Sequence, residues 1–479
     1  MDTIAPKTPA TLPFAAWQAL GPAAAAREVQ GRVDALPPAL RSAALAWLRP
    51  ERELAGELAE NAGANLRATQ DPEVASKLAP TAGTDAARPL QGIPYLLKDL
   101  FDLAGVPTNA GSTFLDKVRG TPDRDAAIVR LLHVRGAVCA GKSQLVEFAS
   151  GLTGENPHYG DCPHPRFPDR LSGGSSSGSA ALVAAGVVPL AVGTDTGGSV
   201  RVPAAWCGLF GFRLTPGDKL IADAFPLAPT LDTAGWFTAN APDLMTVWRA
   251  IVLGSANRPD EPRAGRNGTT HPADSPHPFG SGSGMWRGCY LPLHALLPGH
   301  DAATDRAGET AAEKFCPPAD AATQAGLRGA WREAVDAYVT IGMSEAYSVH
   351  RDWLAPYREH YDPVIWQRFT DAGHYPADRI ARARATRDGV RAAFAQYFMD
   401  HDFLVLPAVP GVAPRKAECT PELRRDILTL TAPASLGGLP VLSLPVSLPS
   451  GLSTGLQVIL PHAGSPAVPW VLKNYRGAG

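Results

Sequence analysis

The sequence predicts an α/β protein with a large buried core and no internal repeats. Short apolar runs bounded by Gly and Pro alternate with helical patterns from about residue 90 onward. Hydrophobic residues make up 45% of the 479 positions and charged residues 19%, so a large buried core is possible and a wholly disordered chain is excluded. No internal repeat is evident along the chain.

We expect residues 1–479 to form one domain. Its N-terminal part, 1–75, is expected to be a helical layer, because it is rich in Ala, Leu, Arg and Glu between proline-containing turns. The core is expected from residues 85–255 and 285–479. The polar stretch 256–284, rich in Pro, Gly and His, contains little that could enter a core and is expected to be a flexible excursion.

One helix and strand unit is clear in the first half of the core. Thr121-Pro122 offers a cap and a first-turn proline, apolar residues follow at helical spacing, and Gly136 is expected to end the helix. Residues 137–140 then have the character of a buried strand. Further strands are expected at 187–192, 403–409 and 439–446, and further helices at 324–348 and 378–399.

Charge and cysteine usage exclude several classes of protein. The formal net charge is −2, which gives no electrostatic footprint for nucleic acid or for an anionic membrane. No window of 18 uninterrupted apolar residues and no basic, apolar leader is present, so neither a membrane span nor a secretory signal is expected. The six cysteines are scattered without a C-x-x-C pair, which favours a reducing, cytoplasmic location.

Residues Gly136 to Ser143 are a literal match to the phosphate-binding pattern G-x-x-x-x-G-K-[ST]. Such a loop follows a strand and leaves backbone amides bare around the phosphates. Here a helical pattern precedes the match, and its four intervening residues have the character of the strand itself. We therefore favour a helix end, a strand and a turn, with a nucleotide-binding loop as the alternative.

A second motif, Gly174 to Gly178, fits the G-x-S-x-G elbow of α/β-hydrolases with Ser176 as nucleophile. An elbow lies between a strand and a helix. A helical pattern follows the motif, but the proline-rich stretch 163–170 before it is unlike a strand. An esterase that uses Ser176 is therefore a less favoured alternative.

The third candidate combines two Ser/Gly loops, 171–186 and 193–208, with a distant lysine. Around Ser199, glycines leave the hydroxyl uncrowded, and successive backbone amides in such a turn can converge on an anion. Lys98 ends an apolar run that would draw its ammonium group out of water, which lowers a lysine pKa and lets the amine act as a base. Asp99 would oppose this effect if its carboxylate faced the amine.

His158, Cys162 and His164 lie close enough in sequence to suggest metal ligands. Prolines interrupt this segment and a fourth ligand is lacking, so an ordinary loop is favoured and no metal is expected.

Together the two loops and the lysine segment resemble the amidase signature family. The family pattern joins a GGSS-type loop to G-x-D-x-G-x-S-[LIVM]-R-x-P. This chain matches it at Gly173, Gly174, Ser175, Ser176, Gly193, Asp195, Gly197, Ser199, Val200, Arg201 and Pro203. A separate match, GIPYLLKD, ends at Lys98-Asp99, and the resemblance spans roughly residues 85 to 460.

The resemblance implies a twisted mixed β-sheet surrounded by helices and an amidohydrolase that needs no cofactor. Ser199 would be the nucleophile, Ser175 the bridging serine after a cis Gly174–Ser175 bond, and Lys98 the base. The acyl-enzyme on Ser199 would come from a small-molecule amide, urea or carbamate. The expected oxyanion hole consists of four successive backbone amides, those of Thr196, Gly197, Gly198 and Ser199.

Other positions refine this expectation. Ser150 and Ser176 are expected to contact substrate, Arg213 replaces the family's usual lysine, and no closing helix is expected after Gln457. A homodimer is compatible with the sequence.

The alternative within the family is an amidotransferase component that acts with partners on charged tRNA. Its tyrosine-rich EASSN-type segment has no counterpart here, because EAYSVH stands at 345–350. The run at 155–160 is more similar to free-standing amidases, including carboxybiuret-hydrolase-like enzymes.

Overall fold

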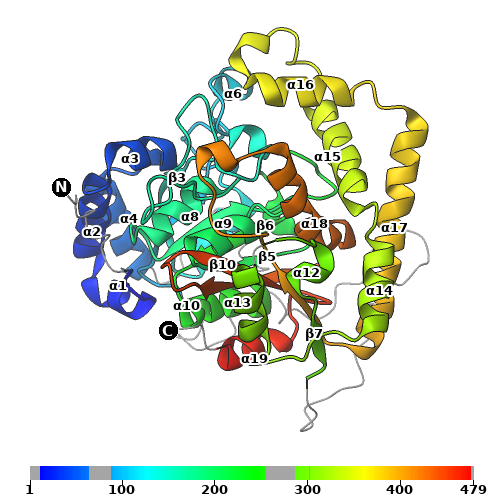
Figure 1. The fold of residues 1–479 in the computed structure, drawn as a ribbon. Coiled ribbons are helices and arrows are strands. Elements are labelled where there is room, and N and C mark those ends of the chain that lie inside the picture. The colour runs from blue at the N-terminus through cyan, green and yellow to red at the C-terminus, as the bar shows by residue number, and fades with distance from the viewer. Residues whose placement is uncertain (1–10, 64–87, 255–285, 301, 476–479) are drawn as a thin grey trace, which may run out of the picture.

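The computed structural model describes residues 11–63, 88–254, 286–300 and 302–475 (Figure 1). Within them, one 10-stranded sheet has the order β1-β3-β2-β4-β6-β5-β9-β10-β8-β7. The strands are β1 (Leu45–Leu48), β2 (Pro94–Lys98), β3 (Val138–Ser143), β4 (Leu190–Thr194), β5 (Phe210–Arg213), β6 (Ala234–Thr238), β7 (Gly288–Tyr290), β8 (Phe403–Pro407), β9 (Val441–Ser447) and β10 (Ser453–Ile459).

The sheet is mixed, as expected. β2 runs parallel to both of its neighbours, β3 and β4, and β7 runs parallel to β8. The remaining neighbours are antiparallel. Every residue of β2, β3 and β4 is buried, which explains why β2 and β4 are mostly apolar in the sequence rather than alternating. β3 runs through Gly141, Lys142 and Ser143, where a turn was expected after residue 140.

Helices surround the sheet (Figure 1). The N-terminal helices α1–α4 gather at one side of the molecule, and α15–α17 stand at the opposite side. The helices are α1 (Phe14–Leu20), α2 (Pro22–Asp34), α3 (Pro38–Ala44), α4 (Glu51–Gly63), α6 (Leu115–Arg119), α7 (Ala127–Val134), α8 (Ser177–Ala184), α9 (Arg201–Cys207), α10 (Ala241–Trp248), α12 (Leu293–Leu296), α13 (Ala302–Ala312), α14 (Ala321–Ala330), α15 (Ala334–His350), α16 (Pro363–Ala372), α17 (Ala377–Asp400), α18 (Pro421–Gly437) and α19 (Ala467–Asn474).

The single helix expected at 324–348 is two helices, α14 and α15, separated by a turn at 331–333, and two other expected elements also differ in the structure. The helix expected from Thr121 begins only at Ala127, because the preceding residues are tied to another loop: Ala126 N donates to Asp102 O at 2.9 Å and Asp125 Oδ1 accepts from Ala104 N at 2.9 Å. A closing helix, α19, does follow Gln457. It lies against α10, and its apolar residues, Val471 among them, are buried.

The N-terminal layer is not purely helical. Leu45–Leu48 forms β1, which pairs antiparallel with β3 at the edge of the sheet. An apolar four-residue strand between two helices carries no local signal that separates it from a helical turn, so only its pairing reveals it. The expected excursion at 256–284 lies outside the described residues.

Gly136 ends the first core unit as expected. Its φ is +100°, and a Cβ at this position would lie 2.6 Å from Gln91 Cα, so only glycine fits. In the part of the chain described here, no helix is both long and apolar enough to cross a membrane.

Candidate active site

The candidate site forms where β2 and β4 end side by side. The two strands are parallel, so their carboxyl ends meet at the same edge of the sheet. Lys98 is the last residue of β2 and Thr194 the last of β4. The loop that contains Ser175 then leads into α8, and the loop after β4 leads through Ser199 into α9.

Lys98 is completely buried and is surrounded by hydroxyl groups. Its Nζ lies 2.8 Å from Ser175 Oγ, 3.0 Å from Ser176 Oγ and 2.8 Å from Thr194 Oγ1. Burial lowers the pKa of Lys98 to about 7, although the more distant carboxylates of Asp195 and Asp232 oppose this shift. The amine is therefore poised to exchange a proton near neutral pH.

Asp99 does not face Lys98. Its carboxylate lies 2.5 Å from the Nζ of Lys142 on β3 and accepts a hydrogen bond from Asn109 N at 3.0 Å. The Asp99 carboxylate is thus paired with another buried lysine. It therefore does not oppose the lowering of the Lys98 pKa, as it would if it faced that amine.

The Gly174–Ser175 peptide bond is cis, as the resemblance implies. This bond lies just before α8, and Ser176 is the N-cap residue of that helix. The Ser176 hydroxyl donates to Thr194 O at 3.1 Å and accepts from Thr194 N at 3.3 Å. Ser175 Oγ has Lys98 as its partner.

These contacts bear on the two roles considered for Ser176. No strand precedes it, so the elbow of an α/β-hydrolase is absent. Its hydroxyl is fully buried between Lys98 and β4, and Ser176 is not among the residues that line the cavity containing Ser199, so its contact with substrate stays a prediction. Ser176 helps to hold the Lys98 amine.

The Ser199 loop is organised by Asp195. Asp195 Oδ1 accepts from Gly198 N at 2.8 Å, and Asp195 Oδ2 accepts from Val200 N at 3.0 Å. Gly198 has φ +134°, a conformation that favours glycine. This turn presents Ser199 at the start of α9.

The four expected oxyanion amides fall into two groups. Gly198 N donates to Asp195 and is not available to a ligand, which corrects the expectation for that residue. The amides of Thr196, Gly197 and Ser199 find no acceptor among the described residues. Three amides, not four, therefore remain free to bind an anion.

Two buried arginines form ion pairs with Asp195. Arg201 Nη2 lies 2.9 Å and Arg213 Nη1 3.0 Å from Asp195 Oδ1, and all three side chains are fully buried. Burial opposes the ionisation of Asp195, but the two guanidinium groups outweigh it and hold the pKa of this carboxyl well below its ordinary value. Arg213, the departure from the family pattern, thus supplies a second ion pair to the loop.

Ser199 opens onto a cavity of about 520 Å³. Ser150 lines the same cavity, and its hydroxyl is buried without a hydrogen-bond partner. Tyr338 lines it as well and contacts the loop so closely that a Cβ on Gly197 would collide with the Tyr338 hydroxyl. A second cavity of about 130 Å³ is lined by Asp232, among others.

Sequence reasoning missed Thr194, Asp232 and Tyr338. Thr194 is the last residue of β4, and the pairing of β4 with β2, which the sequence does not show, brings it to Lys98. Asp232 accepts from the Thr196 hydroxyl at 2.6 Å, and burial raises the pKa of Asp232 to about 6. Asp232 and Tyr338 come from distant segments, and no local pattern points to them.

The interpretation of Gly136–Ser143 as a phosphate-binding loop is wrong. Val138–Ser143 is the buried strand β3, so its backbone amides belong to the sheet rather than to a loop. Its lysine, Lys142, is buried and paired with Asp99.

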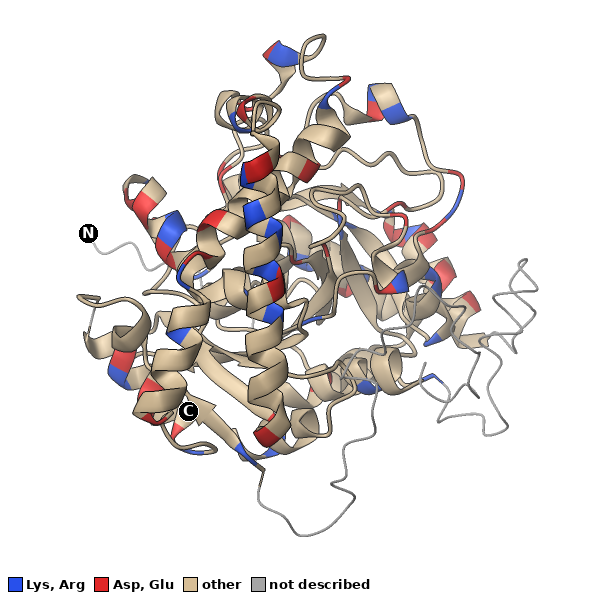
Figure 2. Ribbon diagram, turned by 90° about the vertical axis from the view of Figure 1, so that its right-hand side faces the viewer, with Lys and Arg blue, Asp and Glu red and all other residues tan. Residues whose placement is uncertain are grey.

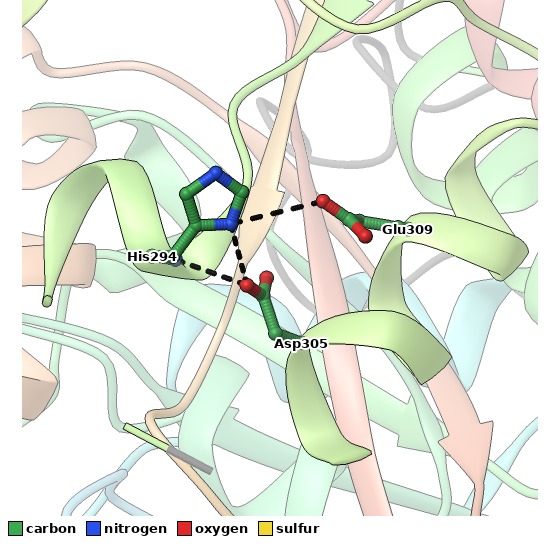
Figure 3. Close-up of side chains that lie close together, drawn as sticks. All are labelled: His294, Asp305 and Glu309. Atoms are coloured by element: carbon green, nitrogen blue, oxygen red, sulfur yellow. Dashed lines mark hydrogen bonds and ion pairs between the residues drawn. The ribbon is translucent and has the colours of Figure 1, made fainter. Parts of the chain in front are cut away.

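The candidate ligands at 158–164 do not converge on a metal. His158 Nε2 lies 2.9 Å from Glu147 Oε1, whereas His164 Nε2 faces Trp206 O at 3.1 Å. The described residues hold one other group, shown in Figure 3: His294 of α12 with Asp305 and Glu309 of α13. Asp305 already accepts from Leu293 N at 2.8 Å and from His294 Nδ1 at 2.6 Å, so local hydrogen bonds account for this group.

Comparisons with known proteins agree with this geometry. A family model described as Amidase matches residues 58–465. A glutamyl-tRNA(Gln) amidotransferase subunit from Anaeromyxobacter dehalogenans (strain 2CP-C) is 33% identical over 77% of this chain and 79% of its own. The AtzE component of 1-carboxybiuret hydrolase from Pseudomonas sp. (strain ADP) is 32% identical over 80% and 81%. Amidase 1 of Arabidopsis thaliana is 28% identical over 80% and 92%.

A solved structure described as an amidase covers 97% of this chain and 99% of its own, with a TM-score of 0.74 and 25% sequence identity. The fold and the extent of the family match therefore agree. The chain belongs to the amidase family.

Proposed function

We propose that this chain is an amidohydrolase that cleaves the C–N bond of a small amide, urea or carbamate through an acyl-enzyme on Ser199. The observation that carries the proposal is the buried Lys98 amine, 2.8 Å from Ser175 Oγ, beside a loop that presents Ser199 to a cavity. No carboxylate pairs directly with this amine in the described residues, and burial outweighs the more distant Asp195 and Asp232.

Hydrogen-bond directions favour Ser175 over Ser176 as the proton carrier. The Ser176 hydroxyl hydrogen is donated to Thr194 O at 3.1 Å, so Ser176 meets Lys98 only as an acceptor. Ser175 has no competing acceptor among the described residues. Neutral Lys98 would accept a proton from Ser175, while Ser175 accepts one from Ser199.

Ser199 Oγ would then attack the substrate carbonyl carbon, and the carbonyl oxygen would gain the negative charge. The free amides of Thr196, Gly197 and Ser199 would bind that oxygen. As the C–N bond breaks, the proton returns through Ser175 to the leaving amine. Water would hydrolyse the acyl ester by the same relay, releasing the acid and Ser199.

The test is a hydrolysis screen of a mixed panel of amides, ureas and carbamates by mass spectrometry, with the purified chain and with Ser199→Ala as the blank. We expect cleavage of at least one member by the unaltered chain and none by the variant. Equal product from both proteins, or no product from either across the panel, would refute the proposal.

The amidotransferase alternative has support in the 33% identity to a component of that enzyme. It predicts that the single chain needs partner proteins and a charged tRNA, whereas the favoured interpretation predicts turnover by the chain alone. The same screen separates the two.

We also propose a cytoplasmic location, since all six cysteines are free thiols. A homodimer stays a prediction that light scattering of the purified chain would test.

A further inference from the structure

The wall of the Ser199 cavity is unusually basic. Four arginines and one aspartate line it: Arg368, Arg379, Arg424, Arg425 and Asp336. They come from α15, α16, α17 and α18, on the side of the molecule that carries α15–α17 in Figure 1. α17 faces the viewer in Figure 2, where it shows more basic than acidic segments.

Two of the four arginines are neutralised by the protein itself. Arg424 Nη2 lies 2.6 Å from Glu155 Oε2, and Arg425 Nη1 lies 3.2 Å from Asp336 Oδ1. The Asp336 charge is therefore also matched by an arginine. These pairs leave no net charge for a ligand.

The other two arginines have no carboxylate within ion-pair distance in the described part of the chain. Arg368 Nη1 donates to the backbone oxygen of Ser150 at 2.9 Å. Arg379 Nε donates to Thr340 Oγ1 at 3.1 Å, and its guanidinium stacks on Tyr375, 3.8 Å from the ring centroid. Both groups are held in place by neutral partners, and each keeps further N–H donors.

Arg368 lies against Ser150 on the cavity wall. Burial and the neighbouring Arg424 lower the pKa of Arg368, although Asp362 and Glu155 partly offset this. Ser150, whose carbonyl holds Arg368, is only 6% exposed, and its hydroxyl has no hydrogen-bond partner. A guanidinium without a carboxylate at ion-pair distance and an unsatisfied buried hydroxyl thus lie together on the wall of the cavity.

From this arrangement we infer that the substrate is an amide that also carries a carboxylate, which Arg368 and Arg379 bind while Ser199 attacks the amide carbonyl. The inference rests on the proposed function and names the substrate class of that site. A guanidinium offers two parallel N–H groups that match a carboxylate, and the Ser150 hydroxyl can donate a further hydrogen bond. The substrate carboxylate would supply the negative charge that Arg368 and Arg379 do not receive from an ion pair within the protein.

The experiment measures binding without turnover. Ser199→Ala is titrated by calorimetry with malonamate, succinamate and glutaramate, and with the neutral diamide of each length. We expect at least one carboxylate to bind roughly 10- to 100-fold more tightly than its diamide, the usual strength of a charged hydrogen-bonded pair. Arg368→Gln and Arg379→Gln, each added to Ser199→Ala, should remove most of this preference.

Arg382→Gln is the matched control, because Arg382 lies on the same helix as Arg379, is exposed and pairs with Asp378 outside the cavity. It should leave the preference unchanged. Equal affinity for every carboxylate and its diamide would overturn the inference even if an arginine variant failed to fold. A preference that survives in both Arg368→Gln and Arg379→Gln would overturn it as well.

Failure of the proposed function would look different. The amide screen would then show no difference between the unaltered chain and Ser199→Ala, whatever the titrations show. If neutral amides are cleaved in a Ser199-dependent way and the carboxylates bind no better, only the substrate class is wrong.

Discussion

Replacement of Lys98 should change both the rate and its pH dependence. A lysine in water has a pKa near 10.4, so at pH 7 only about one in 10³ is neutral. With the pKa lowered to about 7 by burial, half of the Lys98 amines are neutral at that pH. Burial therefore raises the fraction of Lys98 that is neutral at pH 7 roughly 10²- to 10³-fold.

The sign of the pH effect follows from which form reacts. The neutral amine is the base, so kcat/KM should rise with pH, by about tenfold between pH 6 and 8, and then level off. Lys98→Ala should lose activity across the whole range. Lys98→Arg should be no better, because a guanidinium stays charged.

The assay uses a neutral substrate found in the screen, with circular dichroism at each pH to verify folding. Lys473→Ala, at an exposed lysine on α19, is the control and should keep the rise of kcat/KM with pH. A rise of kcat/KM centred near pH 10 would contradict the lowering of the Lys98 pKa by burial. A rise that persists unchanged in Lys98→Ala would show that another group is the base.

Three further perturbations test the surroundings of the amine. Ser175→Ala should lower kcat by roughly 10²–10⁴, the usual worth of a positioned acid or base, and a full rate at saturating substrate would remove Ser175 from the relay. Asp195→Asn leaves two buried arginines without their carboxylate, so the free energy of unfolding measured in urea should fall by about 3–5 kcal/mol; an unchanged midpoint would contradict this role. Gly197→Ala forces the loop away from Tyr338 and should lower kcat, whereas Gly197→Ala with Tyr338→Ala should recover part of it; a single variant with normal kcat would show that the loop tolerates the shift.

The sequence was most informative where chemistry depends on local spacing. Lys98, Ser175 and Ser199 are separated widely along the chain, yet each lies in a short motif whose glycines and apolar neighbours specify a turn or a strand end. The buried strands β2 and β4 and the first half of β3 were also foreseeable, because each is a short, mostly apolar run.

The features that could not be predicted from the sequence depend on tertiary contacts. Nothing local shows that Asp99 turns to Lys142, or that Asp195 takes the Gly198 amide. The unpaired arginines on α16 and α17 lie far beyond Ser199 in sequence and reach its cavity only because their helices pack there. β1 was missed for the same reason, since its identity as a strand lies in its pairing with β3.

Mass-spectrometric mapping of a covalent label tests the central claim most directly. A fluorophosphonate reacts with a serine that has been activated as a nucleophile, and a peptide map identifies which serine carries the adduct. We predict one adduct, on Ser199, that disappears in Ser199→Ala and forms far more slowly in Lys98→Ala. An adduct on Ser176, or labelling of Ser199 at an unchanged rate without Lys98, would contradict this mechanism.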